Sequence, residues 1–91
     1  MSILLITYAK KTPLKDYGPL YEAIKANSLT WWHYLDDVWI VSTSITPDEY
    51  AKKLYPFITT NDRLLVAKLS SEYQGWLPTD AWEWLNKQNY Y

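Results

Sequence analysis

The sequence predicts an α+β domain in which two helices cover one face of a four-stranded antiparallel sheet. Two short runs, residues 3–8 and 38–41, are apolar on both strand faces, which is typical of central strands covered by helices. Two other segments repeat apolar residues at helical spacing, and the predicted elements follow in the order β-α-β-β-α-β. A chain of 91 residues has room for one such domain.

The first strand, residues 3–8, is expected to lead into a helix. Asp16 is a suitable N-cap for this helix, and Pro19 falls in its first turn, where a missing N–H costs no hydrogen bond. The side chains that recur on its predicted buried face are Tyr17, Leu20, Tyr21 and Ile24.

A hairpin is expected next. Residues 29–35 are rich in aromatic side chains, and Asp36 and Asp37 suit a two-residue turn into the next strand. Because side chains alternate along a strand, one of the Trp31 and Trp32 rings should face the helix-covered core and the other the open face of the sheet. The open-face ring would then stack on a ligand or pack in a dimer interface.

The second helix is expected to begin at Pro47, because Thr46 and Glu49 have the spacing of a capping box. Its predicted buried face consists of Tyr50 and Leu54 with Phe57 or Ile58. Residues 63–69 are predicted to form the last strand, since they are mostly apolar and follow a polar loop.

The whole chain, residues 1–91, is expected to form a single domain with a core of residues 1–69. Residues 70–91 then make a C-terminal extension, in which Pro78 interrupts regular structure. Thr79 is placed to cap a short, tryptophan-rich helix in this extension.

This order of elements is that of the ferredoxin-like βαββαβ arrangement, here followed by a short C-terminal helix. The apolar pattern places the two doubly apolar strands in the centre of the sheet and the other two at its edges. The ferredoxin-like topology places them in the same way, so pattern and topology agree.

Composition narrows the classes of function. With 9 Lys and Arg against 10 Asp and Glu, the chain lacks the basic excess of a strong nucleic-acid binder. The absence of cysteine excludes disulfides, zinc–thiolate sites and thiol nucleophiles. No apolar run is long enough to span a membrane, so we expect a cytoplasmic protein. Its 6 Trp, 9 Tyr and 1 Phe are more rings than one small core hides, which indicates a ligand or an interface.

Five stretches of the chain carry a family resemblance. They are residues 6–8 (Ile-Thr-Tyr), 17–25 (Tyr-Gly-Pro-Leu-Tyr-Glu-Ala-Ile-Lys), 31–36 (Trp-Trp-His-Tyr-Leu-Asp), 39–43 (Trp-Ile-Val-Ser-Thr) and 61–69 (Asn-Asp-Arg-Leu-Leu-Val-Ala-Lys-Leu). Across them the chain resembles the SinR-like proteins, small relatives of the ferredoxin-like CRISPR-associated adaptation and endoribonuclease subunit. The resemblance implies a homodimer that pairs through its sheets. We expect residues 76–91 to pack across the partner subunit and to bury tryptophan rings there.

The same resemblance bears on catalysis. In the nuclease members, an Asp directly after the Tyr that ends the first strand binds a divalent metal at the dimer interface. That Tyr matches Tyr8, and the next position is Ala9, whose methyl group cannot bind Mg²⁺. We therefore expect no metal site, no cofactor and no catalytic residue.

A ligand site is expected near the loop after the first strand. Lys10 and Lys11 are predicted to lie beside the hydroxyls of Thr43 and Ser44, because two ammonium groups and several hydroxyls at one rim can hold a phosphate. The aromatic side chains assigned to this site are Tyr8, Trp31, Trp32 and His33. The alternative is a solvated polar loop, with His33 hydrogen-bonded locally on an edge strand.

These observations predict a non-catalytic homodimeric binding module for a nucleotide-like ligand, with sequestration of a nucleotide signal as one such role. Binding to long nucleic acids is expected to be weak or absent, because the domain has almost no net charge. Two alternatives stay open. One is a metal-dependent nuclease of the CRISPR-associated endoribonuclease type with its metal ligand in a neighbouring loop, and the other is a module that binds a protein partner.

Overall fold

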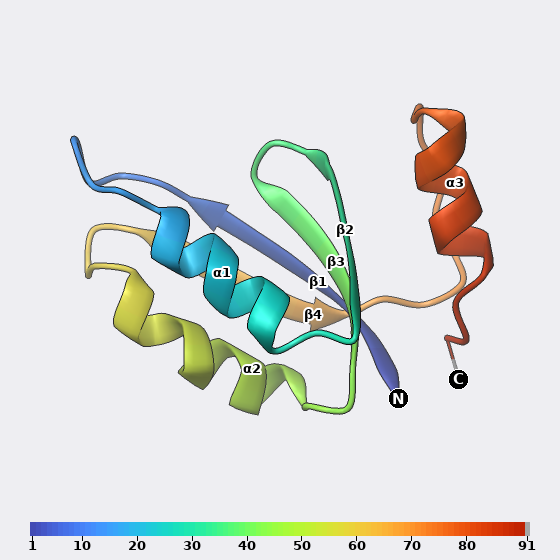
Figure 1. Ribbon diagram of the computed structural model, residues 1–91, viewed down its shortest axis with the longest axis horizontal. Coiled ribbons are helices and arrows are strands. Elements are labelled where there is room, and N and C mark those ends of the chain that lie inside the picture. The colour runs from blue at the N-terminus through green and yellow to red at the C-terminus, as the bar shows by residue number, and fades with distance from the viewer. Residues whose placement is uncertain (91) are drawn as a thin grey trace.

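The computed structural model describes residues 1–90 and has the predicted ferredoxin-like arrangement (Figure 1). Its elements are β1 (Ser2–Ala9), α1 (Gly18–Ala26), β2 (Thr30–Leu35), β3 (Val38–Thr43), α2 (Pro47–Leu54), a 3₁₀ turn (Tyr55–Phe57), β4 (Arg63–Lys68) and α3 (Thr79–Asn86). The strands lie in the order β2-β3-β1-β4, and every neighbouring pair is antiparallel. The two doubly apolar strands, β1 and β3, are central, which confirms the prediction.

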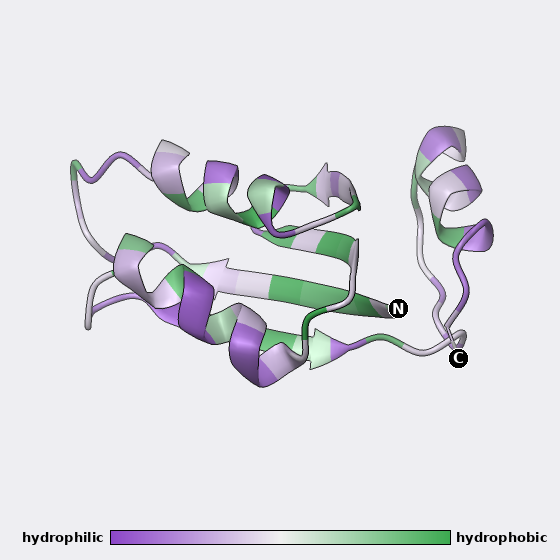
Figure 2. Ribbon diagram, turned by 60° about the horizontal axis from the view of Figure 1, so that its bottom comes forward, coloured by the Kyte–Doolittle hydropathy of each residue, from purple (hydrophilic) through white to green (hydrophobic). Residues whose placement is uncertain are grey.

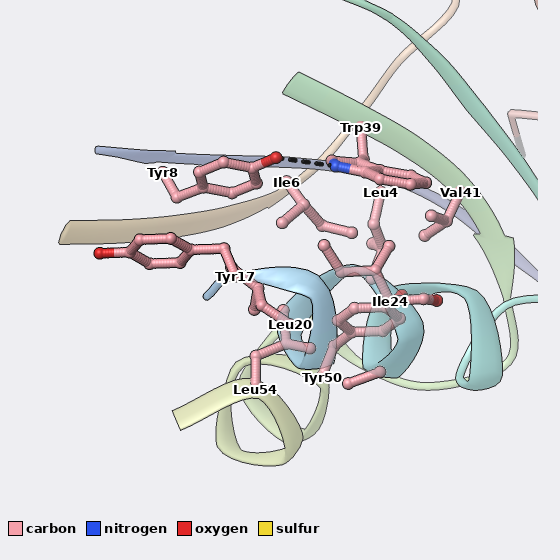
Figure 3. Close-up of a cluster of buried hydrophobic side chains, with 11 residues drawn as sticks. Leu4, Ile6, Tyr8, Tyr17, Leu20, Ile24, Trp39, Val41, Tyr50 and Leu54 are labelled. Atoms are coloured by element: carbon pink, nitrogen blue, oxygen red, sulfur yellow. Dashed lines mark hydrogen bonds between the residues drawn. The ribbon is translucent and has the colours of Figure 1, made fainter. Parts of the chain in front are cut away.

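Helices α1 and α2 cover one face of the sheet and enclose the main core (Figure 3). The core residues with no exposed surface are Leu4, Ile6, Leu20, Ile24, Val41, Tyr50 and Leu54. The Tyr50 hydroxyl donates a hydrogen bond to the Ile24 carbonyl oxygen at 2.8 Å, so its polar end is satisfied inside the core. Burial raises the pKa of Tyr50 to about 12.

The predicted helix caps are right in one case and wrong in two. The Thr46 Oγ1 accepts a hydrogen bond from the Glu49 backbone N–H at 3.2 Å, as expected for the start of α2. Helix α1 begins at Gly18, and Asp16 accepts from the Gly18 N–H at 2.9 Å in a tight turn before the helix. Thr79 does not cap α3 but is its first residue, with no side-chain cap.

The C-terminal extension packs on the other face of the same chain's sheet. Figures 1 and 2 show α3 apart from α1 and α2, near the end of the molecule where β1 begins. Ala81 and Leu85 of α3 join Ile3, Trp32 and Ile40 of the sheet in a second, smaller buried cluster. We expected this segment to bury its rings on a partner subunit. Within residues 1–90 the segment covers part of its own chain's sheet through Ala81 and Leu85, while Trp76 is fully exposed. Its contact with a partner subunit stays a prediction, and Tyr91 lies outside the described residues.

No helix within residues 1–90 is long and apolar enough to cross a membrane. In Figure 2 hydrophilic and hydrophobic residues alternate along α2, as expected for a helix with one buried side.

Candidate ligand-binding site

The strand register separates the two halves of the predicted phosphate site. Strand β1 pairs with β3 so that Ser2 lies opposite Thr43 and Thr7 lies opposite Val38. The loop after β1, which carries Lys10, therefore lies beside the start of β3. Thr43 and its neighbours lie at the opposite end of the sheet. The prediction that both lysines meet these hydroxyls is wrong, because antiparallel neighbours place the end of one strand beside the start of the other.

The hydroxyl groups at that far end have structural partners. The Thr43 side chain is buried, and its Oγ1 donates to the Asn27 carbonyl oxygen at 2.9 Å and accepts from the Ile45 N–H at 3.2 Å. Ser44 is exposed beside a hollow of about 190 Å³. No charged residue lines this hollow among those described, so it offers little to a phosphate.

The Trp32 ring is also unavailable to a ligand. It faces the second side of the sheet, as one of the two tryptophans must, but only 2% of its surface is exposed. Its indole N–H donates to the Ala81 carbonyl oxygen at 3.2 Å, so α3 covers it. The expectation that the open-face ring meets a ligand or a partner subunit is therefore corrected: the ring meets the chain's own extension.

Four aromatic residues on the helix-covered side of the sheet form a continuous group around Trp39. We call this group the aromatic shelf: Tyr21 of α1, Trp31 and His33 of β2, and Trp39 of β3. The His33 ring is stacked on Trp39, with 3.8 Å between centroids and 16° between planes. Trp31 meets the same indole at 5.3 Å, and Tyr21 meets it at 6.0 Å. Trp39 is buried and forms the base of the shelf, whereas 43% of Trp31 is exposed.

Two lysines flank the aromatic shelf. Lys10 Nζ donates to the Tyr21 hydroxyl at 3.0 Å, and this hydrogen bond raises the pKa of Lys10, which is therefore a cation at neutral pH. Lys10 also lies 3.6 Å from a carboxylate oxygen of Asp37. At the other end, Lys25 Nζ lies 5.0 Å from the centroid of the Trp31 ring. Lys11 is exposed and belongs to the loop rather than to the shelf.

Tyr8 supports the aromatic shelf from below. Its hydroxyl accepts a hydrogen bond from the Trp39 indole N–H at 2.9 Å (Figure 3) and donates to the Asp36 carbonyl oxygen at 3.4 Å. Burial raises the pKa of Tyr8 well above its usual range, against the opposing effect of the Trp39 hydrogen bond. Tyr8 is thus neutral at pH 7, and it fixes the base of the shelf and does not face a ligand.

His33 has a local partner as well. Its Nε2 lies 3.0 Å from the Asp36 carbonyl oxygen in the hairpin turn. This contact and the stacking on Trp39 fix the orientation of the imidazole, which is the local arrangement considered for it above. His33 is half-buried, and it shares the Trp39 indole as a neighbour with Trp31.

The sequence alone did not single out Asp62, which holds the lysine loop in place. Its buried carboxylate accepts four hydrogen bonds: from the Lys11 N–H at 2.8 Å, the Thr12 hydroxyl at 3.1 Å, the Tyr17 hydroxyl at 2.7 Å and the Thr59 N–H at 2.9 Å. Burial acts to raise the pKa of Asp62, but the hydrogen bonds, with that of Tyr17 foremost, hold it well below its usual range. A lone Asp in a polar loop gave no signal for this role.

Ala9 ends β1 opposite Arg63 of β4, and its methyl group cannot bind a metal ion. Within residues 1–90 there is no group of three or more His, Cys, Asp or Glu side chains that could hold a metal ion. Asp62 directly precedes Arg63, and protein donors already surround its oxygens.

No family model, curated protein or solved structure matches this chain. Function is therefore inferred from the geometry of the aromatic shelf and from its two lysines.

Proposed function

We propose that this protein is a non-catalytic homodimeric binding module that holds a nucleotide-like ligand on the aromatic shelf. The observation that supports it is the exposed Trp31 ring beside the stacked His33, with Lys25 over one end and Lys10 at the other. Flat rings bind a base by stacking, and an ammonium group binds a phosphate by charge. The aromatic shelf offers both: the Trp31 ring for stacking, and the ammonium groups of Lys10 and Lys25 for a phosphate.

The near-neutral charge of the chain favours a small ligand. Long nucleic acids are bound through many phosphate contacts and need a broad basic surface. Here the net charge is −1, and Lys10 is paired with Asp37 while Lys25 is paired with Glu22 at 3.5 Å. One or two phosphates can replace these exposed carboxylate partners, since surface ion pairs contribute only about 0–1 kcal/mol. Stacking of one base adds about 1–3 kcal/mol.

Binding is tested by titrating the full-length protein with mononucleotides, dinucleotides and cyclic nucleotides, followed by calorimetry and native mass spectrometry. We expect a dissociation constant below about 100 μM for at least one class, which is roughly 5–6 kcal/mol. Trp31→Ala and Lys10→Ala should each weaken it at least tenfold. Trp76→Ala is the matched control, because Trp76 is fully exposed and belongs to the C-terminal extension instead. If no nucleotide binds, or if the control loses as much affinity as Trp31→Ala, the shelf is not the site.

The same samples test the other parts of the proposal. Sequestration requires the ligand to be recovered unchanged, and sedimentation should show a dimer at micromolar concentration. Cleavage of RNA that depends on Mg²⁺ or Mn²⁺ would instead favour the nuclease alternative. A protein captured through the Trp31 surface, with no nucleotide bound, would favour a protein-partner module.

A further inference from the structure

The second face of the sheet bears a cleft that the C-terminal extension roofs. Leu5 and Ile40 of the central strands form its floor together with Trp32, and Tyr73, Trp76 and Trp82 line the side formed by the extension. Its volume is about 310 Å³. Small-molecule sites begin at roughly this size, around 300 Å³, so the cleft is large enough for a ligand of two or three rings.

The lining of the cleft carries no charge. None of the residues that line it within the described part of the chain is Asp, Glu, Lys, Arg or His. A phosphate or carboxylate placed there would lose its hydration without gaining an ionic partner, at a cost of several kcal/mol. The aromatic shelf, with Lys10 and Lys25, is the opposite environment. The two sites therefore differ in the charge of the ligand that they accept.

The mouth of the cleft is unusual in being rich in exposed apolar surface. The side chain of Trp76 is fully exposed, and 46% of Leu35 is exposed at the end of β2. Gly75, next to Trp76, has open space where a Cβ would stand, so no neighbouring atom packs against the backbone at that point. A flat ligand in the cleft would give the Trp76 indole a surface to cover, and each buried ring face removes apolar area from water.

We propose that this cleft binds an uncharged planar aromatic compound, held between the sheet and the tryptophans of the extension. The lining supports stacking and apolar contact, and the exposed Gln74 side chain adds a polar group at the rim. A second copy of the chain fits less well, because a stable dimer buries about 1,600 Å² in total and a hollow of this size contributes little to that area.

The probe for the test is N-phenylnaphthylamine, an uncharged dye that fluoresces in apolar sites. Its sulfonated analogue, anilinonaphthalenesulfonate, is nearly the same shape but carries a negative charge. We expect saturable binding of one uncharged dye per chain of the full-length protein. The sulfonated analogue should bind at least tenfold more weakly, because the cleft has no cation to pair with the sulfonate.

Two variants locate the bound dye. Trp76→Ala should weaken binding at least fivefold, and because this side chain is fully exposed the fold is preserved. Trp31→Ala is the matched control, since it removes an exposed tryptophan from the opposite side of the sheet and should leave the dye affinity unchanged. Leu35→Asp, which adds a charge at the mouth, should also weaken binding.

Three results would overturn the proposal: no saturable binding, equal affinity for the two dyes, or a Trp76→Ala variant that binds the dye as well as the original chain. A Trp76→Ala change that alters the sedimentation of the protein but not dye binding would assign this face to a protein interface instead. Nucleotides should not displace the dye, because the two ligands bind at different sites. A lack of nucleotide binding at the shelf, which would contradict the proposed function, is therefore distinguishable from a lack of dye binding in the cleft.

Discussion

The two faces of the sheet are closed in different ways. On one face, α1 and α2 shield a cluster in which seven side chains have no exposed surface, and Asp62 ties the adjoining loops with four hydrogen bonds. On the other face, α3 covers one end with Ala81 and Leu85, and the Trp32 indole donates one hydrogen bond to it. A cleft remains beside this cover.

This difference separates the parts of the chain that hold the fold from the parts that remain available for binding. Apolar burial contributes most of the free energy of folding, and it is concentrated on the helix-covered face. The exposed tryptophans of the two candidate sites lie away from that core: Trp31 at its edge, and Trp76 on the opposite side of the sheet. Changes to these exposed residues can therefore be made with little effect on folding, whereas Trp39 and Trp32 are buried in the two clusters.

The largest expected effect tests this contrast directly. Leu20→Ala removes a side chain with no exposed surface from α1 and should lower the free energy of unfolding by about 3–4 kcal/mol. Leu85→Ala removes an equally large side chain from α3 and should cost about 2 kcal/mol. The loss is smaller for Leu85→Ala because we expect α3 to detach from the sheet without unfolding the rest of the chain. A change in α3 then cannot cost more than the free energy with which α3 packs on the sheet.

Urea unfolding of both variants measures these losses, and native-state hydrogen exchange locates them. In Leu85→Ala, amides of α3 should exchange faster while those of β1 and β3 stay protected. Equal losses in the two variants, with uniform exchange, would mean that the two faces form one cooperative unit.

The next effect concerns the polar contacts that close the helix-covered face. Asp62→Asn keeps one acceptor oxygen but turns an amide N–H₂ toward the Thr59 N–H, so a donor faces a donor. The melting temperature at pH 7 should fall by roughly 5–10 °C. Because the folded-state pKa of Asp62 lies below its ordinary value, the carboxylate stabilises the fold above about pH 4. That contribution is lost as the pH falls toward the folded-state pKa.

Thermal melts between pH 2 and pH 7 test whether the stability of the fold falls with falling pH, as this pKa requires. The original chain should lose stability as the pH falls below about 4, and Asp62→Asn should show a shallower decline over the same range. Asp80→Asn, a change at an exposed acid, provides the control and should retain the decline of the original chain because Asp62 is intact. Parallel curves for the original chain and Asp62→Asn would show that the buried carboxylate is not the group that titrates.

The order of the elements and of the strands could be predicted from the sequence because both follow from local patterns. Runs that are apolar on both faces marked β1 and β3 as central strands, and the Thr46 capping box placed the start of α2 at Pro47. These signals depend on neighbours within a few residues. The extension lacked such a signal, because its docking on the sheet depends on packing between distant residues such as Trp32 and Ala81.

The candidate site could be predicted only in part, for the same reason. Lys10, Trp31 and His33, which the sequence predicts to share one site, do contact members of one group: Lys10 bonds to Tyr21, and both rings meet Trp39. The prediction that Lys10 lies beside Thr43 was wrong because β1 and β3 are antiparallel. The end of β1 and the end of β3 therefore lie at opposite ends of the sheet. Lys25 of α1 contacts the Trp31 ring of β2, and the spacing of the two residues along the chain does not predict this contact.

The smallest effect compares the first turns of α2 and α3. The Thr46 hydroxyl accepts a hydrogen bond from the Glu49 N–H, whereas α3 begins at Thr79 after Pro78 with no side-chain cap. Thr46→Ala should therefore cost about 1 kcal/mol, or roughly 5 °C in melting temperature. Thr79→Ala removes the same atoms from an exposed site without that hydrogen bond and should change stability by only a few tenths of a kcal/mol. Neither change should alter nucleotide or dye binding. If Thr79→Ala destabilises the chain as much as Thr46→Ala, the start of α3 is held by contacts of its own, and the second face is more firmly closed than the contrast between the two faces implies.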